Sequence, residues 1–421
     1  MSFLLISISY YTERFESTLL ISQYFLLFGI YLYFCLQKEK FTVREIISYA
    51  ILFRLLLVIL VPNLSDDVYR FIWDGKLWWD GYDAYSILPS EFLKRSESAK
   101  FLFEKLNSPE YFSIYPPINQ LVFIVITLFD KLFTSIIALR LLIIFTEIGS
   151  LYFLLRVFKQ INLNGKSLLF YAFNPLVVLE LVGNLHFEVF VIFFLVLCIY
   201  YFNQEKKSIS SLSLGLAISF KLFPLIFLAS FFKYLSLRDY LKYIVLSLFL
   251  VAIIFLPFIF SDVFKAIFSS STLYFKNFEF NASIYFLVRE IGFLAKGYNI
   301  IGTAGPILGL ISFSAMVIFN LINIKDMKLA ERMMWTYFIY LLFATTVHPW
   351  YILPLLVLGI ISKYWFPIVW SFLIFVTYWG YTESGYIQNL SLISIEYISL
   401  IIFIVFELSY KRRIKKSNSY A

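Results

Sequence analysis

Long apolar stretches recur along the whole chain, and they constrain the fold more strongly than any other feature of the sequence. A helix of about 20 apolar residues crosses the hydrocarbon core of a bilayer, and only helices and closed barrels satisfy their backbone hydrogen bonds there. Of the 421 residues, 61% are hydrophobic and only 15% are charged, whereas soluble domains contain about 25% charged residues. We therefore expect an all-α polytopic membrane protein rather than a water-soluble one.

The apolar stretches predict about 11 to 13 transmembrane helices, which we treat as one unit over residues 1–421. A further apolar segment, 208–235, is interrupted by Lys221 and Pro224. This interruption predicts two short helices that meet near a membrane face. The predicted spans are, approximately, 17–36, 43–61, 117–133, 136–156, 167–182, 187–202, 240–260, 300–323, 330–346, 350–361, 365–380 and 390–409.

Basic residues form short clusters between the apolar stretches, as expected for loops on the cytoplasmic side. The strongest cluster is the tail 411–421 and the next is 38–44, so both are predicted to be cytoplasmic. One span later, the polar loop 62–116 is predicted on the outer side, with helices at 68–79 and 91–107 that lie along the membrane surface. The net charge of +8 then reflects membrane topology, and no nucleic-acid partner is expected.

The segment 117–160 does not fit a simple alternation of sides. Hydropathy predicts two helices between residue 116 on the outer side and a basic group at 156–166 on the inner side. A change of side requires an odd number of crossings. One of the two helices is therefore expected to be re-entrant or to lie at the interface.

The outer loop contains two adjacent carboxylates immediately after a predicted span. These are Asp66 and Asp67, and both Ser65 and Asp66 are good helix N-cap residues. A carboxylate at the membrane surface is suited to act as a general base toward a hydroxyl group. In the alternative interpretation, Asp66 only caps the following helix and Asp67 is solvated.

Two cations lie next to apolar segments, where an unpaired charge is costly. Lys221 either binds a phosphate group or extends its ammonium group to the interface. Arg289 either makes a bidentate contact with a phosphate or forms an ordinary ion pair with Glu279 or Glu290.

The only two histidines, His186 and His348, both fall beside predicted span ends on the outer side, which predicts a shared polar cavity. Glu180, Asn184 and Glu188 either line this cavity or serve helix packing. No HxH or HExxH spacing is present, so hydrogen bonding to a sugar or phosphate is favoured over metal binding. No metal ion is expected.

The loop motif resembles that of a known enzyme family. Residues 65–75, Ser-Asp-Asp-Val-Tyr-Arg-Phe-Ile-Trp-Asp-Gly, followed by residues 81–85, Gly-Tyr-Asp-Ala-Tyr, resemble the first outer loop of bacterial polyprenyl-phosphate-mannose-dependent mannosyltransferases of the GT-C superfamily. The sequence departs from this family at Asp83-Ala84, where Asn-Pro often precedes the tyrosine. Further short matches follow in order at 115–117, 174–186, 215–224, 280–289 and 348–351.

This resemblance implies a GT-C-like bundle and a glycosyltransferase that moves a sugar, expected to be mannose, from a polyprenyl-phosphate donor to a glycan, lipid or protein acceptor. The reaction is expected on the outer face of a bacterial inner membrane, with membrane lipids as further partners and with no cofactor beyond the donor. Asp66 matches the catalytic aspartate and Asp67 supports it, while Lys221 and Arg289 are expected to hold the donor phosphate. The expected substrate-binding residues are Tyr69, Arg70, Trp73, Asp74, Tyr115, Asn184, His186, Asn281, His348 and Trp350.

A secondary transporter or lipid-linked-sugar flippase is the alternative, because Lys, Glu and His residues within a membrane bundle also form substrate paths. The chain contains no inverted repeat with paired broken helices, and its most polar stretch is an outer loop rather than a midplane site. A non-catalytic membrane assembly subunit is a third class, but it leaves the adjacent pair Asp66 and Asp67 unexplained.

Overall fold

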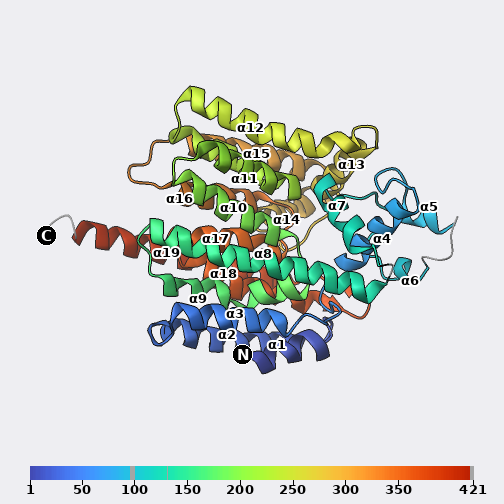
Figure 1. The fold of residues 1–421 in the computed structure, drawn as a ribbon, viewed down its shortest axis with the longest axis horizontal. Coiled ribbons are helices and arrows are strands. Elements are labelled where there is room, and N and C mark those ends of the chain that lie inside the picture. The colour runs from blue at the N-terminus through green and yellow to red at the C-terminus, as the bar shows by residue number, and fades with distance from the viewer. Residues whose placement is uncertain (95–99, 130, 418–421) are drawn as a thin grey trace.

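The computed structural model describes residues 1–94, 100–129 and 131–417, and these form a bundle of helices with many parallel axes (Figure 1). Within these described residues, five helices are long and apolar enough to cross a membrane, or up to six spans if one bent pair of helices is counted as a span. The expected all-α polytopic class is confirmed. The five long helices are α2 Ser17–Leu36, α8 Leu132–Gln160, α12 Leu237–Phe255, α15 Ile301–Leu321 and α19 Leu390–Ser417.

Shorter helices fill the space between the long ones and form the segment that projects from the bundle. In the described part of the chain the only strands are β1 Tyr381–Thr382 and β2 Gly385–Tyr386, which pair as one antiparallel hairpin. The shorter helices are α1 Ser2–Ile6, η1 Ser7–Tyr11, η2 Lys38–Lys40, α3 Val43–Leu55, α4 Asp67–Trp79, α5 Pro89–Leu93, α6 Lys100–Phe103, α7 Pro117–Ile126, η4 Gly165–Leu168, α9 Leu169–Ala172, η5 Val177–Gly183, α10 Glu188–Phe202, α11 Lys207–Phe220, η6 Phe223–Lys233, η7 Leu256–Phe258, α13 Val263–Lys276, α14 Ile284–Lys296, α16 Leu329–Phe343, η8 Pro349–Ile352, α17 Leu353–Ile361, α18 Phe366–Leu373 and η9 Ile374–Gly380.

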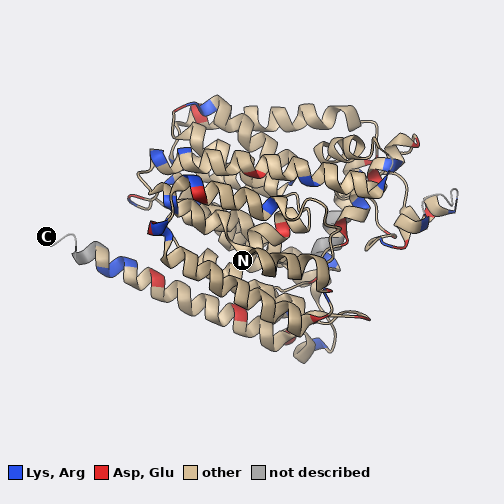
Figure 2. Ribbon diagram, turned by 60° about the horizontal axis from the view of Figure 1, so that its bottom comes forward, with Lys and Arg blue, Asp and Glu red and all other residues tan. Residues whose placement is uncertain are grey.

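The two ends of the bundle differ. Helices α4, α5 and α6 project from one end, which we call the loop end, and α19 extends beyond the opposite end, which we call the tail end (Figure 1). Most of the length of the long helices is uncharged, and most Lys, Arg, Asp and Glu residues gather toward the two ends (Figure 2). This distribution is the one that a hydrocarbon layer around the middle of the bundle requires.

The segment 117–160 contains one helix of spanning length rather than two. Helix α7 has 10 residues and is about 15 Å long, whereas the hydrocarbon core is about 30 Å thick. Helix α8 has 29 residues and is about 44 Å long. A single crossing by α8, with α7 confined to the loop end, removes the conflict in the predicted alternation of sides.

Other predicted segments differ in detail. The predicted span 167–182 is broken, because α9 and η5 meet at 63° around Asn174 and Pro175. The predicted surface helix 68–79 agrees with α4, but 91–107 contains only the end of α5 and all of α6, and residues 95–99 lie outside the described part. The predicted tail 411–421 continues α19 as far as Ser417, and residues 418–421 are likewise outside it.

The interruption at Lys221 separates two helices, as predicted. Helix α11 ends at Phe220 and η6 begins at Phe223, and Lys221 between them has an extended backbone, with φ −147° and ψ 141°. Pro224 lies at the start of η6, where its missing N–H group costs no helical hydrogen bond.

Two arginines that are fully buried connect the helices around the site. Arg54 of α3 forms an ion pair with Glu147 of α8, with 2.7 Å between Nη2 and Oε2. Arg140 of α8 donates instead to main-chain carbonyl groups: Nε donates to Val182 at 2.9 Å, and Nη2 donates to Gly183 at 3.1 Å.

Arg140 also reaches the segment that enters the outer loop. Its Nη1 donates to the carbonyl oxygens of Val58, at 3.1 Å, and Leu60. One guanidinium group therefore holds the chain just before Asp66 against the chain just before His186.

We predict that R140Q destabilises the protein, because the shorter neutral side chain leaves several buried carbonyl oxygens without a donor, at about 1–3 kcal/mol for each. The measurement is the apparent melting temperature of the purified protein in detergent. R156Q is the matched control, because Arg156 lies on the exposed surface of the same helix and donates to the Tyr152 hydroxyl at 2.7 Å. Equal melting temperatures for R140Q and R156Q would contradict this role of Arg140.

Candidate active site

Helix α4 places the two adjacent carboxylates at the loop end. Asp66 is its N-cap residue, but its side chain makes no capping hydrogen bond, so the carboxylate is directed to other partners. The helix lies directly against α7, because a Cβ atom on Gly75 would collide with the carbonyl group of Phe123. Glycine at this position therefore sets the distance between α4 and α7.

Beyond its acidic N-terminal end, α4 is held in place by a buried polar network. Arg70 Nε lies 2.7 Å from Asp74 Oδ1, and Arg70 Nη1 donates to the carbonyl oxygen of Ser108 at 3.0 Å. The other Asp74 oxygen accepts from Ser113 at 2.5 Å and from Gln120 at 3.0 Å. Arg70 and Asp74 thus fix the outer loop to α4 and α7, and their predicted contact with substrate stays a prediction.

The two adjacent aspartates have different partners. Asp66 Oδ2 lies 2.6 Å from Arg14 Nη1, and the two side chains are 32% and 33% exposed. Asp67 Oδ1 accepts from Asn107 at 2.9 Å, and its Oδ2 lies 3.8 Å from His186 Nε2. Both carboxylates are thus accessible to water and to a substrate.

His186 lies between acidic groups that come from different segments. Its Nδ1 is 3.2 Å from Glu180 Oε2, and its Nε2 is 3.3 Å from Ser65 Oγ. The preceding residue, Leu185, has φ +64°, a left-handed conformation that is unusual for a residue with a branched side chain. Asn184 also donates to Glu180, at 2.9 Å.

The two histidines contact the same tryptophan ring, and the predicted polar cavity between them stays a prediction. Trp350 stacks on His186 with ring centroids 3.7 Å apart, and on His348 with centroids 4.4 Å apart. Phe280 contacts the His348 ring at 4.4 Å. Removal of the ring from water, together with the charges of His186 and Lys221, lowers the pKa of His348 to about 3.

The two cations assigned to the donor phosphate both hold carboxylates. Lys221 forms an ion pair with Glu188, whose side chain is fully buried. Arg289 lies 2.6 Å from Glu279 and 2.9 Å from Glu290. For Arg289 these are the ion pairs of the alternative interpretation, whereas for Lys221 the alternative was extension to the interface, and phosphate binding by either cation stays a prediction.

The remaining predicted substrate-binding residues differ in their exposure and in their contacts. Tyr69 and Trp73 are 8% and 2% exposed in α4, and the Tyr115 ring packs edge-on against Phe71, with centroids 5.0 Å apart. Asn281 donates to Glu396 at 3.2 Å. The structure thus groups Asp66, Asp67, Asn184, His186, His348 and Trp350, while Arg289 and Asn281 belong to separate polar networks.

Sequence reasoning missed two residues of this site, Arg14 and Tyr381. The guanidinium group of Arg14 lies 5.2 Å from the centre of the Tyr381 ring. A signal for Arg14 was present, because it is a cation before the first predicted span, on the side that carries few basic residues under the positive-inside rule. Tyr381 had no comparable signal among 31 tyrosines.

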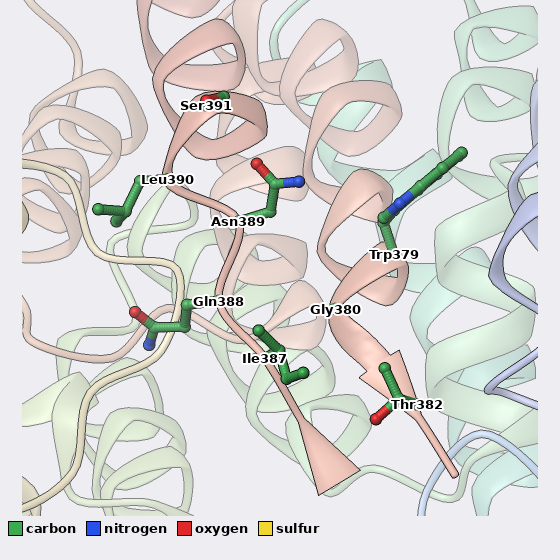
Figure 3. A pocket seen from close by; sticks show the side chains of 8 residues that line it. All are labelled: Trp379, Gly380, Thr382, Ile387, Gln388, Asn389, Leu390 and Ser391. Atoms are coloured by element: carbon green, nitrogen blue, oxygen red, sulfur yellow. The ribbon is translucent and has the colours of Figure 1, made fainter. Parts of the chain in front are cut away.

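A surface pocket of approximately 470 Å³ lies next to Tyr381, between η9, the β-hairpin and the start of α19 (Figure 3). Of the described residues that line it, none is charged. Its chemistry is that of aromatic and amide groups, which suits a sugar or an apolar chain better than a phosphate. Its lining residues are Trp379, Gly380, Thr382, Ile387, Gln388, Asn389, Leu390 and Ser391.

Within the described residues, no group of three or more His, Cys, Asp or Glu side chains is arranged to hold a metal ion. The expectation that no metal takes part stays a prediction.

We predict that H348N reduces the acid sensitivity of the fold. The folded state holds the pKa of His348 near 3, below the usual value of about 6.5, so the unfolded state binds more protons between these two values and wild-type stability falls as the pH falls. The measurement is the apparent melting temperature between pH 7 and pH 4. Parallel curves for wild type and H348N would contradict a His348 that is held neutral in the folded state.

Comparison with known proteins adds an independent observation. Residues 8–236 match the model of the family described as alpha-(1->6)-mannopyranosyltransferase, N-terminal domain. No curated protein and no solved structure matches the chain. The matched range is more than half of the sequence and contains Arg14, Asp66, Asp67 and His186. The chain therefore belongs to this alpha-(1->6)-mannopyranosyltransferase family, and it is a multi-pass membrane glycosyltransferase.

Proposed function

We propose that the protein transfers mannose from a polyprenyl-phosphate donor to the 6-hydroxyl group of a glycan acceptor, with Asp66 as the general base. The observation that carries this proposal is the pair of accessible carboxylates, Asp66 and Asp67, at the N-terminal end of α4 beside His186. The position of the hydroxyl group follows from the linkage in the name of the family.

The proposed reaction moves one proton and exchanges one bond. The acceptor oxygen bonds to the anomeric carbon of mannose as the Asp66 carboxylate takes its proton. The bond between that carbon and the phosphate oxygen breaks, and its electron pair leaves with the polyprenyl phosphate. General base catalysis of this kind contributes about 10²- to 10⁴-fold to the rate.

The neighbours of Asp66 have supporting roles in this proposal. Asp67 is oriented by Asn107 and adds negative charge beside the anomeric carbon, where positive charge develops in glycosyl transfer. His186 is held by Glu180 and by stacking on Trp350, so it is fixed in place to hydrogen-bond a sugar hydroxyl group.

We place the reaction on the non-cytoplasmic face. Helix α2 leads from Arg14 beside the site to the basic cluster that begins at Lys38, and α19 leads to the basic tail from Lys411 onward. Both clusters are therefore at the end opposite the site, and the positive-inside rule favours a cytoplasmic position for that end. The lipid-linked donor reaches the loop end from the outer leaflet.

We predict that the rate of mannosyl transfer by D66N is at least about 10²-fold lower than that of wild type, because an amide cannot take the acceptor proton. The measurement is transfer from radiolabelled polyprenyl-phosphate-mannose to a membrane glycan extract, with and without a chelator. D80N is the matched control, because Asp80 is the exposed C-cap residue at the other end of α4. Transfer by D80N is expected to equal that of wild type.

Three outcomes would contradict parts of this proposal. Loss of transfer in D67N but not in D66N would assign the base to Asp67. Loss of wild-type activity with the chelator would show that the reaction requires a metal ion. The protein would be a flippase rather than a transferase if wild type transferred no sugar from mannose, glucose or arabinose donors and translocated the donor in liposomes.

A further inference from the structure

We propose that Arg14 binds the phosphate group of the lipid-linked donor, and that it gives up its ion pair with Asp66 to do so. This inference rests on the proposed function, because it assigns a substrate contact to Arg14, which pairs with the proposed base Asp66. In the resting protein the guanidinium group occupies Asp66 Oδ2, so an acceptor hydroxyl group has to compete with it. After the exchange, the carboxylate is free to accept the proton.

The other cations near the site are held more firmly than Arg14. Lys221 pairs with the fully buried Glu188, and Arg289 pairs with two carboxylates at once. Removal of a cation from a buried carboxylate leaves an uncompensated charge, which is costly. Arg14 and Asp66 are each about one-third exposed, so water replaces the lost partner and the ion pair opens more easily.

The main chain around Arg14 is fixed next to the entry of the outer loop. Asn63 Nδ2 donates to the carbonyl oxygens of Ile8 and Thr12, at 3.1 Å and 2.5 Å. Arg14 follows in a turn between η1 and α2. The backbone therefore stays beside Asp66, while the long side chain changes its direction.

Tyr381 gives the guanidinium group a contact that does not depend on Asp66. The guanidinium carbon lies 5.2 Å from the centre of the ring, and a cation–π contact uses the face of the guanidinium group and leaves its N–H groups free for an anion. A phosphate accepts two parallel N–H bonds from a guanidinium group and gains negative charge as its bond to the sugar breaks. The donor phosphodiester and the carboxylate each carry one negative charge, so the second charge that appears on the leaving polyprenyl phosphate favours the exchange as the bond breaks.

The uncharged pocket beside Tyr381 is consistent with this assignment. Its described lining residues, including Gly380 and Thr382 on either side of Tyr381, supply no cation. Arg289 also reaches the pocket, because it donates to the lining residue Gln388 at 3.3 Å, but it already pairs with Glu279 and Glu290. We therefore assign the phosphate group to Arg14, while the pocket itself is suited to the sugar or lipid part of a substrate.

The test is equilibrium binding of radiolabelled polyprenyl phosphate to the full-length protein in lipid nanodiscs. R14Q is expected to bind about ten- to hundredfold more weakly, because a charge-assisted hydrogen bond is lost. R14K is expected to lie between R14Q and wild type, because it keeps the charge without the planar fork.

The opposite effect is expected for the partner of Arg14. D66N should bind polyprenyl phosphate about three- to tenfold more tightly than wild type, because Arg14 no longer leaves a carboxylate to reach the phosphate. The double variant R14Q/D66N should bind as weakly as R14Q. Loss of the Asp66 charge by itself also favours binding of an anion, so the double variant separates the two roles: tighter binding by R14Q/D66N than by R14Q would contradict the role of Arg14.

R156Q is the matched control, because Arg156 also lies over a tyrosine ring, that of Tyr152, at 5.0 Å, near the far end of α8 from the site. Its binding is expected to equal that of wild type. Wild-type affinity in R14Q, or unchanged or weaker binding in D66N, would overturn the proposal. Displacement of the ligand by phosphatidic acid or inorganic phosphate at comparable concentration would also overturn it, because Arg14 would then recognise any phosphate.

This assay contains no sugar, so its result is independent of mannosyl transfer. A wild-type protein without transferase activity contradicts the proposed function alone. Transfer by wild type with unchanged lipid-phosphate binding in R14Q and D66N contradicts the role of Arg14 alone.

Discussion

The contact on which the site depends is made by Arg140, a buried cation that donates four hydrogen bonds to main-chain carbonyl groups. Four carbonyl oxygens from two segments surround one planar guanidinium group, and each of these groups is costly to bury without a partner. The arrangement is therefore satisfied in only one relative position of the two segments. One of them leads to Asp66 and the other to His186, so a single buried charge sets the distance between the carboxylates and the histidine.

Charge balance then determines how a substrate can enter. At the loop end, Arg14, Lys221 and Arg289 each hold at least one carboxylate, and the acidic groups Glu180 and Asp67 flank His186. A donor that carries a phosphate group meets a site whose cations are already paired. In our proposal it binds by exchange rather than by filling an empty positive site, and the exchange is easiest at the most exposed pair.

Much of the helical framework could be predicted from the sequence, because apolar runs of about 20 residues have one stable form in a bilayer. The predicted span 17–36 has the bounds of α2, and the break at Lys221 separates α11 from η6. The predictions that failed concern segments in which hydropathy and length disagree. The predicted span 117–133 is mostly apolar, yet α7 has only 10 residues and packs closely against α4 at Gly75. Hydropathy also failed to predict the break at Asn174 and Pro175, because the residues on both sides of it are apolar.

The sequence by itself determined that this chain crosses a membrane many times, that its adjacent carboxylates follow a span, and that its motifs are those of a mannosyltransferase family, which the family match confirms. These properties reside in local composition and order. Only the tertiary structure decided that Arg14 faces Asp66, that Trp350 stacks between the two histidines, and that Lys221 and Arg289 are already paired. The contacts of Arg14 with Asp66, Trp350 with His186 and Lys221 with Glu188 join residues far apart in the chain, whereas Trp350 with His348 and Arg289 with Glu279 are close in sequence. Charge and hydropathy show that a buried ion needs a partner, but the packing of the helices selects which partner it has.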